Sequence, residues 1–127
     1  MNEQSTTPDS RGFDLAERTA LFGESILSFV TGISRDEIRG PLVRQLVRSG
    51  TSIGANYMEA DEAGTKKEFR YRISVFCRES RETQYWLRMI AAAAPKHKHV
   101  ARTLWQEAHE LTLIFGSIHR KSKTAPK

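Results

Sequence analysis

The chain has 127 residues, of which 39% are hydrophobic, with one cysteine and a net charge of +5. This length fits one compact domain, and the single cysteine, Cys77, excludes a disulfide within the chain. No window approaches about 18 consecutive apolar residues, and residues 1–14 contain no apolar run, so we expect no membrane span, no signal peptide and a cytoplasmic location.

The amino-terminal third predicts a tail followed by one helix. Residues 1–12 are polar and aperiodic, so we expect them to be disordered. From Phe13 to Ile33, apolar residues recur at spacings of four and three, which is typical of a helix with one buried face. That face comprises Leu15, Thr19, Phe22, Ile26, Phe29 and Ile33. Ser34–Glu37 then has the order of a capping box that starts another helix, and Gly40 with Pro41 should kink that helix or reset its start.

The second helix is expected to run to Glu62, with Gly64 as its stop. Its apolar face comprises Leu42, Leu46, Ile53 and Ala60. Gly50 and Gly54 lie on one flank of this face, although each glycine costs about 1 kcal/mol relative to alanine inside a helix. We therefore predict that these two glycines let the backbone of a neighbouring helix approach closely.

The opposite flank of the second helix is polar and comprises Gln45, Ser49, Ser52, Asn56 and Glu59. It lies too close to the apolar face to be fully solvated, and buried polar groups need hydrogen-bond partners. We therefore predict a structural polar seam, formed chiefly by Gln45, Ser52, Asn56 and Glu59, in place of a catalytic site.

The third helix opens with a second capping box, Thr65–Glu68, and ends in the alanine run before Pro95. Its core face comprises Phe69, Ile73, Phe76, Ser80, Thr83, Leu87 and Ile90. A second face, which we call the basic stripe, comprises Lys67, Arg70, Ser74, Arg78, Arg81, Tyr85 and Arg88.

A third face of the same helix combines carboxylates with apolar bulk, in Val75, Glu79, Glu82 and Trp86. Because Val75 and Trp86 lie away from the core face, they indicate contact with another subunit, for which Glu79, Glu82 and Trp86 are the candidate interface residues. The alternative is that Trp86 folds back over its own bundle.

Pro95 suits the first turn of a fourth helix, and residues 121–127 form a loose basic tail. The buried face of this helix is predicted to comprise Val100, Leu104, Glu107 or Ala108, Leu111, Phe115 and Ile118. Four amphipathic helices with short connections predict an all-α, antiparallel up-and-down four-helix bundle over residues 13–120.

The motifs of several enzyme classes are missing from the sequence. No histidine follows a glutamate at the Glu-x-x-His spacing of di-iron bundles, and Leu113 occupies the place of the second histidine of a zinc-binding His-Glu-x-x-His helix. The chain has no phosphate-binding glycine loop and no nucleophile elbow, and Cys77 lies beside the core face. We therefore predict no catalytic residue, no metal, no cofactor and no enzymatic activity.

Two segments, QLVRSGTSIGANYMEA and KKEFRYRISVFCRESRETQYWLRMI, together resemble the bacterial four-helix-bundle family that is also called the rRNA intervening-sequence protein family. The positions that carry the resemblance are Gln45, Arg48, Ser49, Ser52, Ile53, Asn56, Glu59, Glu79, Glu82, Tyr85, Trp86 and Leu87. Ala60 and the pair Gly40 and Pro41 depart from the family pattern.

The resemblance implies a small cytosolic bundle that assembles as a ring-shaped homo-oligomer, commonly a pentamer. The chain is similar as well to the basic accessory proteins of diversity-generating retroelements, which engage reverse transcriptase and RNA. These resemblances imply RNA, DNA or a protein such as a reverse transcriptase as partner.

Charge distribution favours an anionic partner. Residues 1–37 hold seven acidic and three basic residues, whereas residues 38–127 hold eight acidic and seventeen basic ones. The first hypothesis is nucleic-acid binding through Arg44, Arg48 and the basic stripe, with Tyr85 stacking on a base. The basic residues Arg120, Lys121 and Lys123 would extend this surface.

Two alternatives stay open. The arginines of the basic stripe could instead pair with acidic residues of a neighbouring subunit, such as Glu79, Glu82 or those of its first helix. The protein could also be an interaction scaffold or adaptor that binds no nucleic acid.

Overall fold

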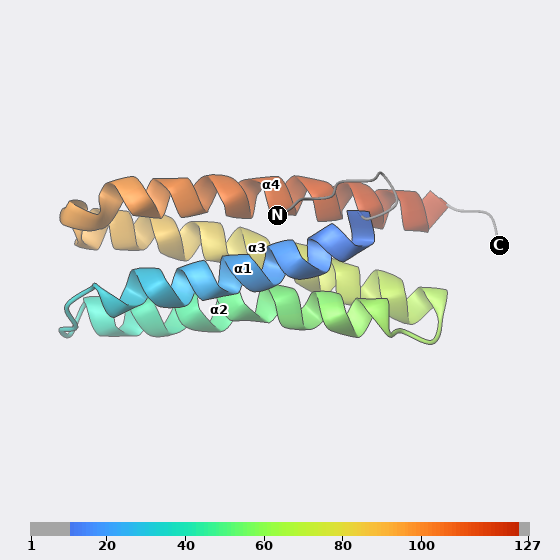
Figure 1. Ribbon diagram of the computed structural model, residues 1–127, viewed down its shortest axis with the longest axis horizontal. Helices are drawn as coiled ribbons and strands as arrows, with labels where there is room; N and C mark the ends of the chain where they lie inside the picture. The colour runs from blue at the N-terminus through green and yellow to red at the C-terminus, as the bar shows by residue number, and fades with distance from the viewer. Residues whose placement is uncertain (1–10, 125–127) are drawn as a thin grey trace, which may run out of the picture.

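The computed structural model describes residues 11–124, with side chains for residues 15–122, and its described residues form four long helices and no strand (Figure 1). The helices are α1 (Arg11–Thr31), α2 (Arg39–Asp61), α3 (Lys66–Ala93) and α4 (Lys98–Thr124), with a short 3-10 helix η2 (Pro95–His97) before α4. Residues 1–10 and 125–127 lie outside the described residues, and with them most of the predicted amino-terminal tail and the last three residues of the predicted basic tail. Helix α1 starts at Arg11, within the segment predicted to be disordered, and α4 ends at Thr124, within the predicted basic tail.

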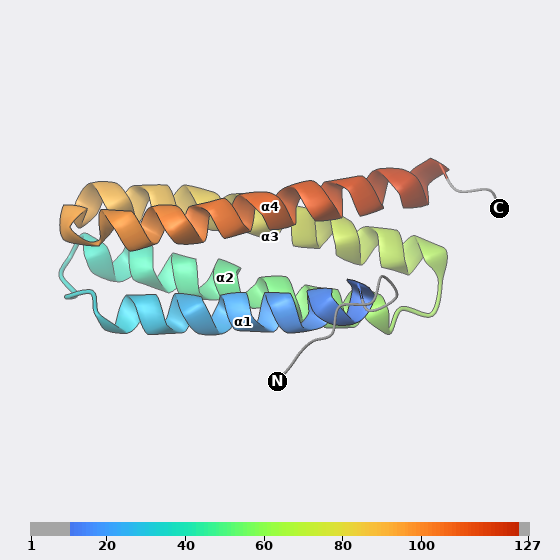
Figure 2. The ribbon, with the colours of Figure 1, turned by 45° about the horizontal axis from the view of Figure 1, so that its top comes forward.

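The four helices run alternately up and down and enclose one core (Figures 1 and 2). Each helix packs on the helix before it in the chain, and α1 closes the bundle against α4, where the contacts are sparsest. This arrangement confirms the predicted all-α four-helix bundle. No helix in the described part of the chain is long and apolar enough to cross a membrane.

The core faces predicted for the first and third helices are confirmed, because Thr19, Ile26, Ile73 and Phe76 are all fully or almost fully buried. At the centre of the core, the ring of Tyr57 packs edge-on against the rings of Phe76 and Phe115. On α4 the prediction was wrong at one position: Val100 is 47% exposed, whereas Ala101 is 1% exposed. The spacing of three and four continues from Ala101 through Leu104, and Val100 lies about 100° away from that face.

The start of α2 differs from the prediction. The helix begins at Arg39, and the carboxylate of Asp36 accepts hydrogen bonds from the backbone N–H groups of Ile38 and Arg39 at 2.9 and 2.7 Å. Asp36, and not Ser34, therefore satisfies the free donors at this helix end. Pro41 is the third residue of α2, where its missing N–H costs no helical hydrogen bond, so Gly40 and Pro41 mark a new helix start without a kink.

Of the two helix ends predicted at the α2–α3 connection, one is confirmed and the other is wrong. The hydroxyl of Thr65 accepts a hydrogen bond from the backbone N–H of Glu68 at 3.0 Å, so the predicted cap of α3 is confirmed. The predicted stop at Gly64 is wrong, because α2 ends at Asp61 and the backbone of Gly64 is not left-handed.

Gly50 and Gly54 lie where α2 crosses α1. A Cβ added at Gly50 would lie 3.0 Å from Cγ1 of Ile26, and one added at Gly54 would lie 3.5 Å from the backbone carbonyl of Thr19. Gly23 of α1 faces them, since its added Cβ would lie 3.8 Å from Cα of Thr51. The absence of side chains at these positions allows α1 and α2 to come together at backbone distance.

Candidate nucleic-acid interface

The basic stripe lies on the side of α3 that is turned away from the core. Lys67, Arg78, Arg81 and Arg88 are exposed, and Arg70 is half-buried. None of the four exposed residues forms a salt bridge with a carboxylate of the described side chains. Tyr85 is 53% exposed among them. Cations without a local counter-charge, interleaved with an accessible aromatic ring, suit an anionic polymer such as nucleic acid.

Arg48 is engaged within the chain and differs in this respect from the basic stripe. Its guanidinium bridges Glu79, at 3.2 Å, and Glu82, and its Nε donates to the side-chain oxygen of Gln45 at 3.2 Å. Two carboxylates already neutralise this arginine, so it contributes little positive charge to the outer surface. Arg44, by contrast, is exposed on α2.

The candidate interface residues Glu79, Glu82 and Trp86 make their described contacts within the same chain. The indole N–H of Trp86 donates to the carboxylate of Glu82 at 3.1 Å, and the ring is half-buried against the core. Val75 is also buried. The side chain of Trp86 therefore packs over its own bundle, as the alternative expected, and contact of its exposed part with another subunit stays a prediction.

The polar seam of α2 faces α3. The hydroxyl of Thr83 donates to the hydroxyl of Ser49 at 2.9 Å, and both side chains are fully buried. Ser52 and Asn56 donate to carbonyl groups within α2, each at 2.9 Å. The carboxylate of Glu59 pairs with Arg72 of α3 at 3.5 Å. The Ser49–Thr83 and Glu59–Arg72 pairs therefore join the two helices, whereas the hydrogen bonds of Ser52 and Asn56 stay within α2. Gln45 and Glu59 of the predicted seam are exposed.

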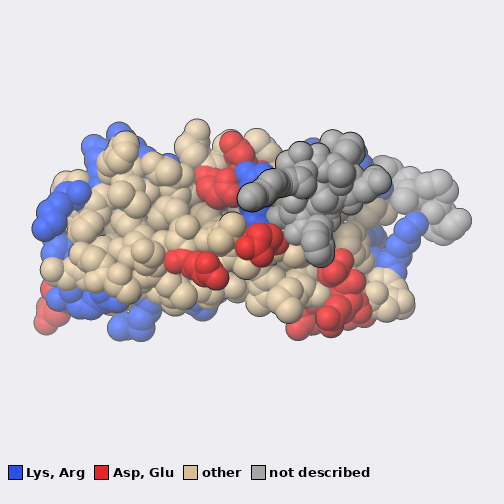
Figure 3. Space-filling view, viewed as in Figure 1, with Lys and Arg blue, Asp and Glu red and all other residues tan. Residues whose placement is uncertain are grey.

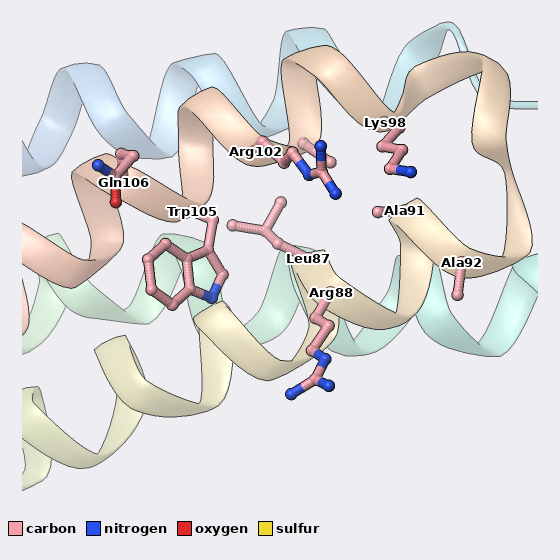
Figure 4. A pocket seen from close by; sticks show the side chains of 9 residues that line it. Leu87, Arg88, Ala91, Ala92, Lys98, Arg102, Trp105 and Gln106 are labelled. Atoms are coloured by element: carbon pink, nitrogen blue, oxygen red, sulfur yellow. The ribbon is translucent and has the colours of Figure 1, made fainter.

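Helix α4 adds residues that the sequence analysis did not single out. Arg88 of the basic stripe shares a pocket with Lys98, Arg102 and Trp105 of α4 (Figure 4). The pocket has a volume of about 660 Å³. Lys98, Arg102 and Trp105 follow one another at spacings of four and three, the same signal that revealed the basic stripe on α3.

The carboxylates of α4 lie on the opposite side of that helix. Arg18 of α1 donates to both oxygens of Glu107, at 2.6 and 2.8 Å, and to Glu110 at 2.7 Å. Its hydrogen bonds to Glu107 and Glu110 raise the pKa of the Arg18 side chain. On the face shown in Figure 3, carboxylates lie along the middle and lower right, and Lys and Arg gather at the margins and the left end. On this face, carboxylates and cations therefore gather mostly in different areas.

Cys77 is buried, and burial raises the pKa of its thiol, although Arg81 and Arg120 oppose that shift. A buried protonated thiol is a poor nucleophile. Among the described residues, no three His, Cys, Asp or Glu side chains lie together in a way that could hold a metal ion.

Comparison with known proteins places the chain in a family. Its sequence matches the family described as 23S rRNA-intervening sequence protein over residues 13–117. Its fold is similar to that of a protein of unknown function from the S23 ribosomal protein family of Bacteroides thetaiotaomicron, with a TM-score of 0.76 and 23% sequence identity, covering 86% of this chain and 97% of that one. No curated protein matches the sequence. The chain belongs to the 23S rRNA-intervening sequence protein family.

Proposed function

We propose that this protein binds nucleic acid in the cytoplasm through the basic stripe of α3 and catalyses no reaction. The observation that carries the proposal is the row of exposed cations, Lys67, Arg78, Arg81 and Arg88, that have no carboxylate partner among the described side chains. Such cations bind phosphates, release counter-ions and make affinity strongly dependent on salt. Phosphate contacts of this kind carry little sequence preference.

We also infer that several copies assemble into a ring, as the family resemblance implies. A ring would bring several basic stripes to one surface, and one nucleic-acid strand could then bind more than one stripe with increased avidity. Glu79 and Glu82 already pair with Arg48, and Trp86 donates to Glu82. These candidate interface residues would therefore contribute to assembly only through the parts of their side chains that these contacts leave accessible.

The experiment is a titration of a labelled RNA of about 20 nucleotides, followed by anisotropy between about 50 and 200 mM salt. Affinity is expected to fall steeply with salt. The double variant Arg78→Glu with Arg81→Glu should lose binding and keep its helicity. The matched control, Arg78→Lys with Arg81→Lys, keeps both charges and should retain most of the affinity.

Two results would oppose the proposal. The first is no binding of RNA or DNA at about 50 mM salt, where phosphate contacts are strong. The second is a charge-reversal variant that binds as well as the unmodified protein. Loss of the oligomer in that variant would instead assign the two arginines to a subunit interface.

The second candidate function is a scaffold that binds a protein, for example a reverse transcriptase, without nucleic acid. Half-exposed apolar side chains at the sparse α1–α4 contact favour it, since Leu21 is 50% exposed beside Phe22 and Leu104 in a shallow groove. Exposed apolar groups at a groove are typical of protein contacts. Under this function Leu21→Glu would abolish capture of the protein partner, whereas charge reversal on α3 would not.

A further inference from the structure

The pocket between α3 and α4 combines an apolar floor with a cationic rim. Leu87 and Ala101 line it and are each only 1% exposed, and Ala91 adds a third small apolar surface. Arg88 and Arg102 also line it and are exposed. With about 660 Å³, the pocket is within the usual size range of small-ligand sites. It can therefore hold a ligand that has both a flat apolar part and a negative charge.

The three cations around the pocket have no described counter-charge. Neither Arg88 of α3 nor Lys98 and Arg102 of α4 forms a salt bridge with any carboxylate whose side chain the structure describes. In Figure 4, Lys98 and Arg102 lie on the α4 side of the pocket, whereas the guanidinium of Arg88 points away from them on the α3 side. A phosphate beside Lys98 and Arg102 could accept hydrogen bonds from both cations.

The aromatic surface of the pocket comes from Trp105, which lies toward the other end in Figure 4. One side of the indole stacks on the imidazole of His109, with ring centroids 5.0 Å apart and planes inclined by 14°. This stacking restricts the rotation of the ring and holds it beside the apolar floor. An indole fixed in this way is a suitable platform for a nucleobase.

We propose that the α3–α4 pocket binds one unpaired nucleotide of a single strand. The base contacts Trp105 and the apolar floor, and its phosphate lies beside Lys98 and Arg102. This inference rests on the proposed function and extends it, because it specifies single strands over duplexes. In a duplex the bases are paired and stacked, so only phosphates can reach the protein without unpairing.

The neighbouring nucleotides have a path along the basic stripe. Arg88 belongs both to the pocket and to the stripe, which continues along α3 through Tyr85, Arg81 and Arg78. A strand anchored in the pocket can therefore place its following phosphates on exposed cations. Duplex could still bind the stripe through phosphates alone, but more weakly.

The test uses the fluorescence of Trp105 in a Trp86→Phe background, in which Trp105 is the remaining tryptophan. A labelled single-stranded RNA of about eight nucleotides and a labelled duplex of the same sequence are titrated at about 50 mM salt. Anisotropy of the label gives the affinities, and Trp105 fluorescence reports contact with the base. The single strand should quench the fluorescence and bind several-fold more tightly than the duplex. Trp105→Ala should lower single-strand affinity about 5- to 150-fold and leave duplex affinity unchanged.

A second variant covers the case in which Trp105→Ala does not fold. Lys98→Ala with Arg102→Ala changes only exposed residues, so it should keep its helicity and lose the preference for single strands. Trp86→Phe itself is the matched aromatic control and should keep that preference.

Four results would overturn the inference. Equal affinity for single strand and duplex, or binding without a change in Trp105 fluorescence, would refute it and leave the proposed function intact. Absence of any nucleic-acid binding would refute both. A fluorescence change that depends on protein concentration alone, with a larger sedimentation coefficient, would assign the pocket to a second copy of the chain.

Discussion

The α1–α2 contact and the α3–α4 groove are built in opposite ways. At the first, side chains are removed: Gly50 and Gly54 let two helices meet at backbone distance. At the second, large side chains such as Arg88, Arg102 and Trp105 border a pocket of about 660 Å³ that no described side chain fills. The first arrangement leaves no room for a ligand and stabilises the fold. The second costs packing but provides a surface for a partner.

The largest effect is expected from a substitution that disrupts the close contact between α1 and α2. In Gly54→Leu, the atoms beyond Cβ would meet the backbone of Thr19, which cannot move as a side chain can. We expect a loss of about 3 kcal/mol or more in the free energy of unfolding, at the upper end of overpacking effects, measured by urea denaturation.

Two controls separate crowding from other effects at this contact. Gly54→Ala adds only a Cβ at 3.5 Å, an ordinary contact distance, and gains helix propensity, so it should be neutral or slightly stabilising. Gly64→Leu has nothing within 4 Å and should change little. Unchanged stability of Gly54→Leu would show that the two helices do not approach closely.

A smaller effect is expected at the buried α2–α3 seam. Thr83→Val keeps the shape of the side chain but removes the donor that serves the hydroxyl of Ser49 at 2.9 Å. We expect a loss of about 1–2 kcal/mol in the free energy of unfolding, since a buried polar group loses its partner.

The matched control for the seam is Thr103→Val. Thr103 is exposed on α4 and bonds only to a backbone carbonyl of its own helix among the described contacts. It should change stability by no more than about 0.5 kcal/mol. Equal effects of the two variants would mean that the Ser49–Thr83 hydrogen bond contributes nothing specific.

Alkaline pH tests the contribution of the buried thiol of Cys77. Burial raises the pKa of Cys77 in the folded protein above its ordinary value of 9.0, so folding favours the neutral thiol. The resulting stability is fully present below the pKa of the unfolded chain and is lost as pH rises through the raised folded value. Thermal unfolding followed above pH 9 should show a gradual decrease, and Cys77→Ala should make it shallower.

Tyr57, a second buried residue with a raised pKa, serves as the control for the pH dependence attributed to Cys77. Burial, and secondly the charge of Asp61, raise the pKa of its hydroxyl above 10.0, so its contribution is lost at higher pH than that of Cys77. If the decrease begins only above about pH 10 and is unchanged in Cys77→Ala, the thiol does not contribute to it.

The smallest effect is expected on the surface between α2 and α3. Arg48 is 47% exposed and pairs with Glu79 and Glu82, so solvent screens much of the attraction. Arg48→Gln should lower the free energy of unfolding by about 0.5 kcal/mol at low salt and by less at about 1 M salt. It should also leave nucleic-acid affinity nearly unchanged, because the charge is already neutralised. A large loss of nucleic-acid affinity in this variant would show that Arg48 belongs to the binding surface.

Much of the fold and part of the candidate site could be predicted from local features of the sequence. Spacing alone identified the core faces of α1 and α3, the Thr65 cap and the basic stripe, because side-chain direction in a helix follows from position along the chain. The start of α2 was missed because Ser34 and Asp36 can both act as caps. Which of them does so depends on where the chain leaves α1.

Tertiary structure decided the rest. Periodicity describes one helix at a time and contains no information on the rotation and register of its neighbours. Only the packed bundle placed Arg48 beside Glu79 and Glu82, turned Trp86 onto its own core and brought Arg88 next to Trp105. The candidate site is therefore formed by two helices, and the sequence of each helix reveals only its own half of the site.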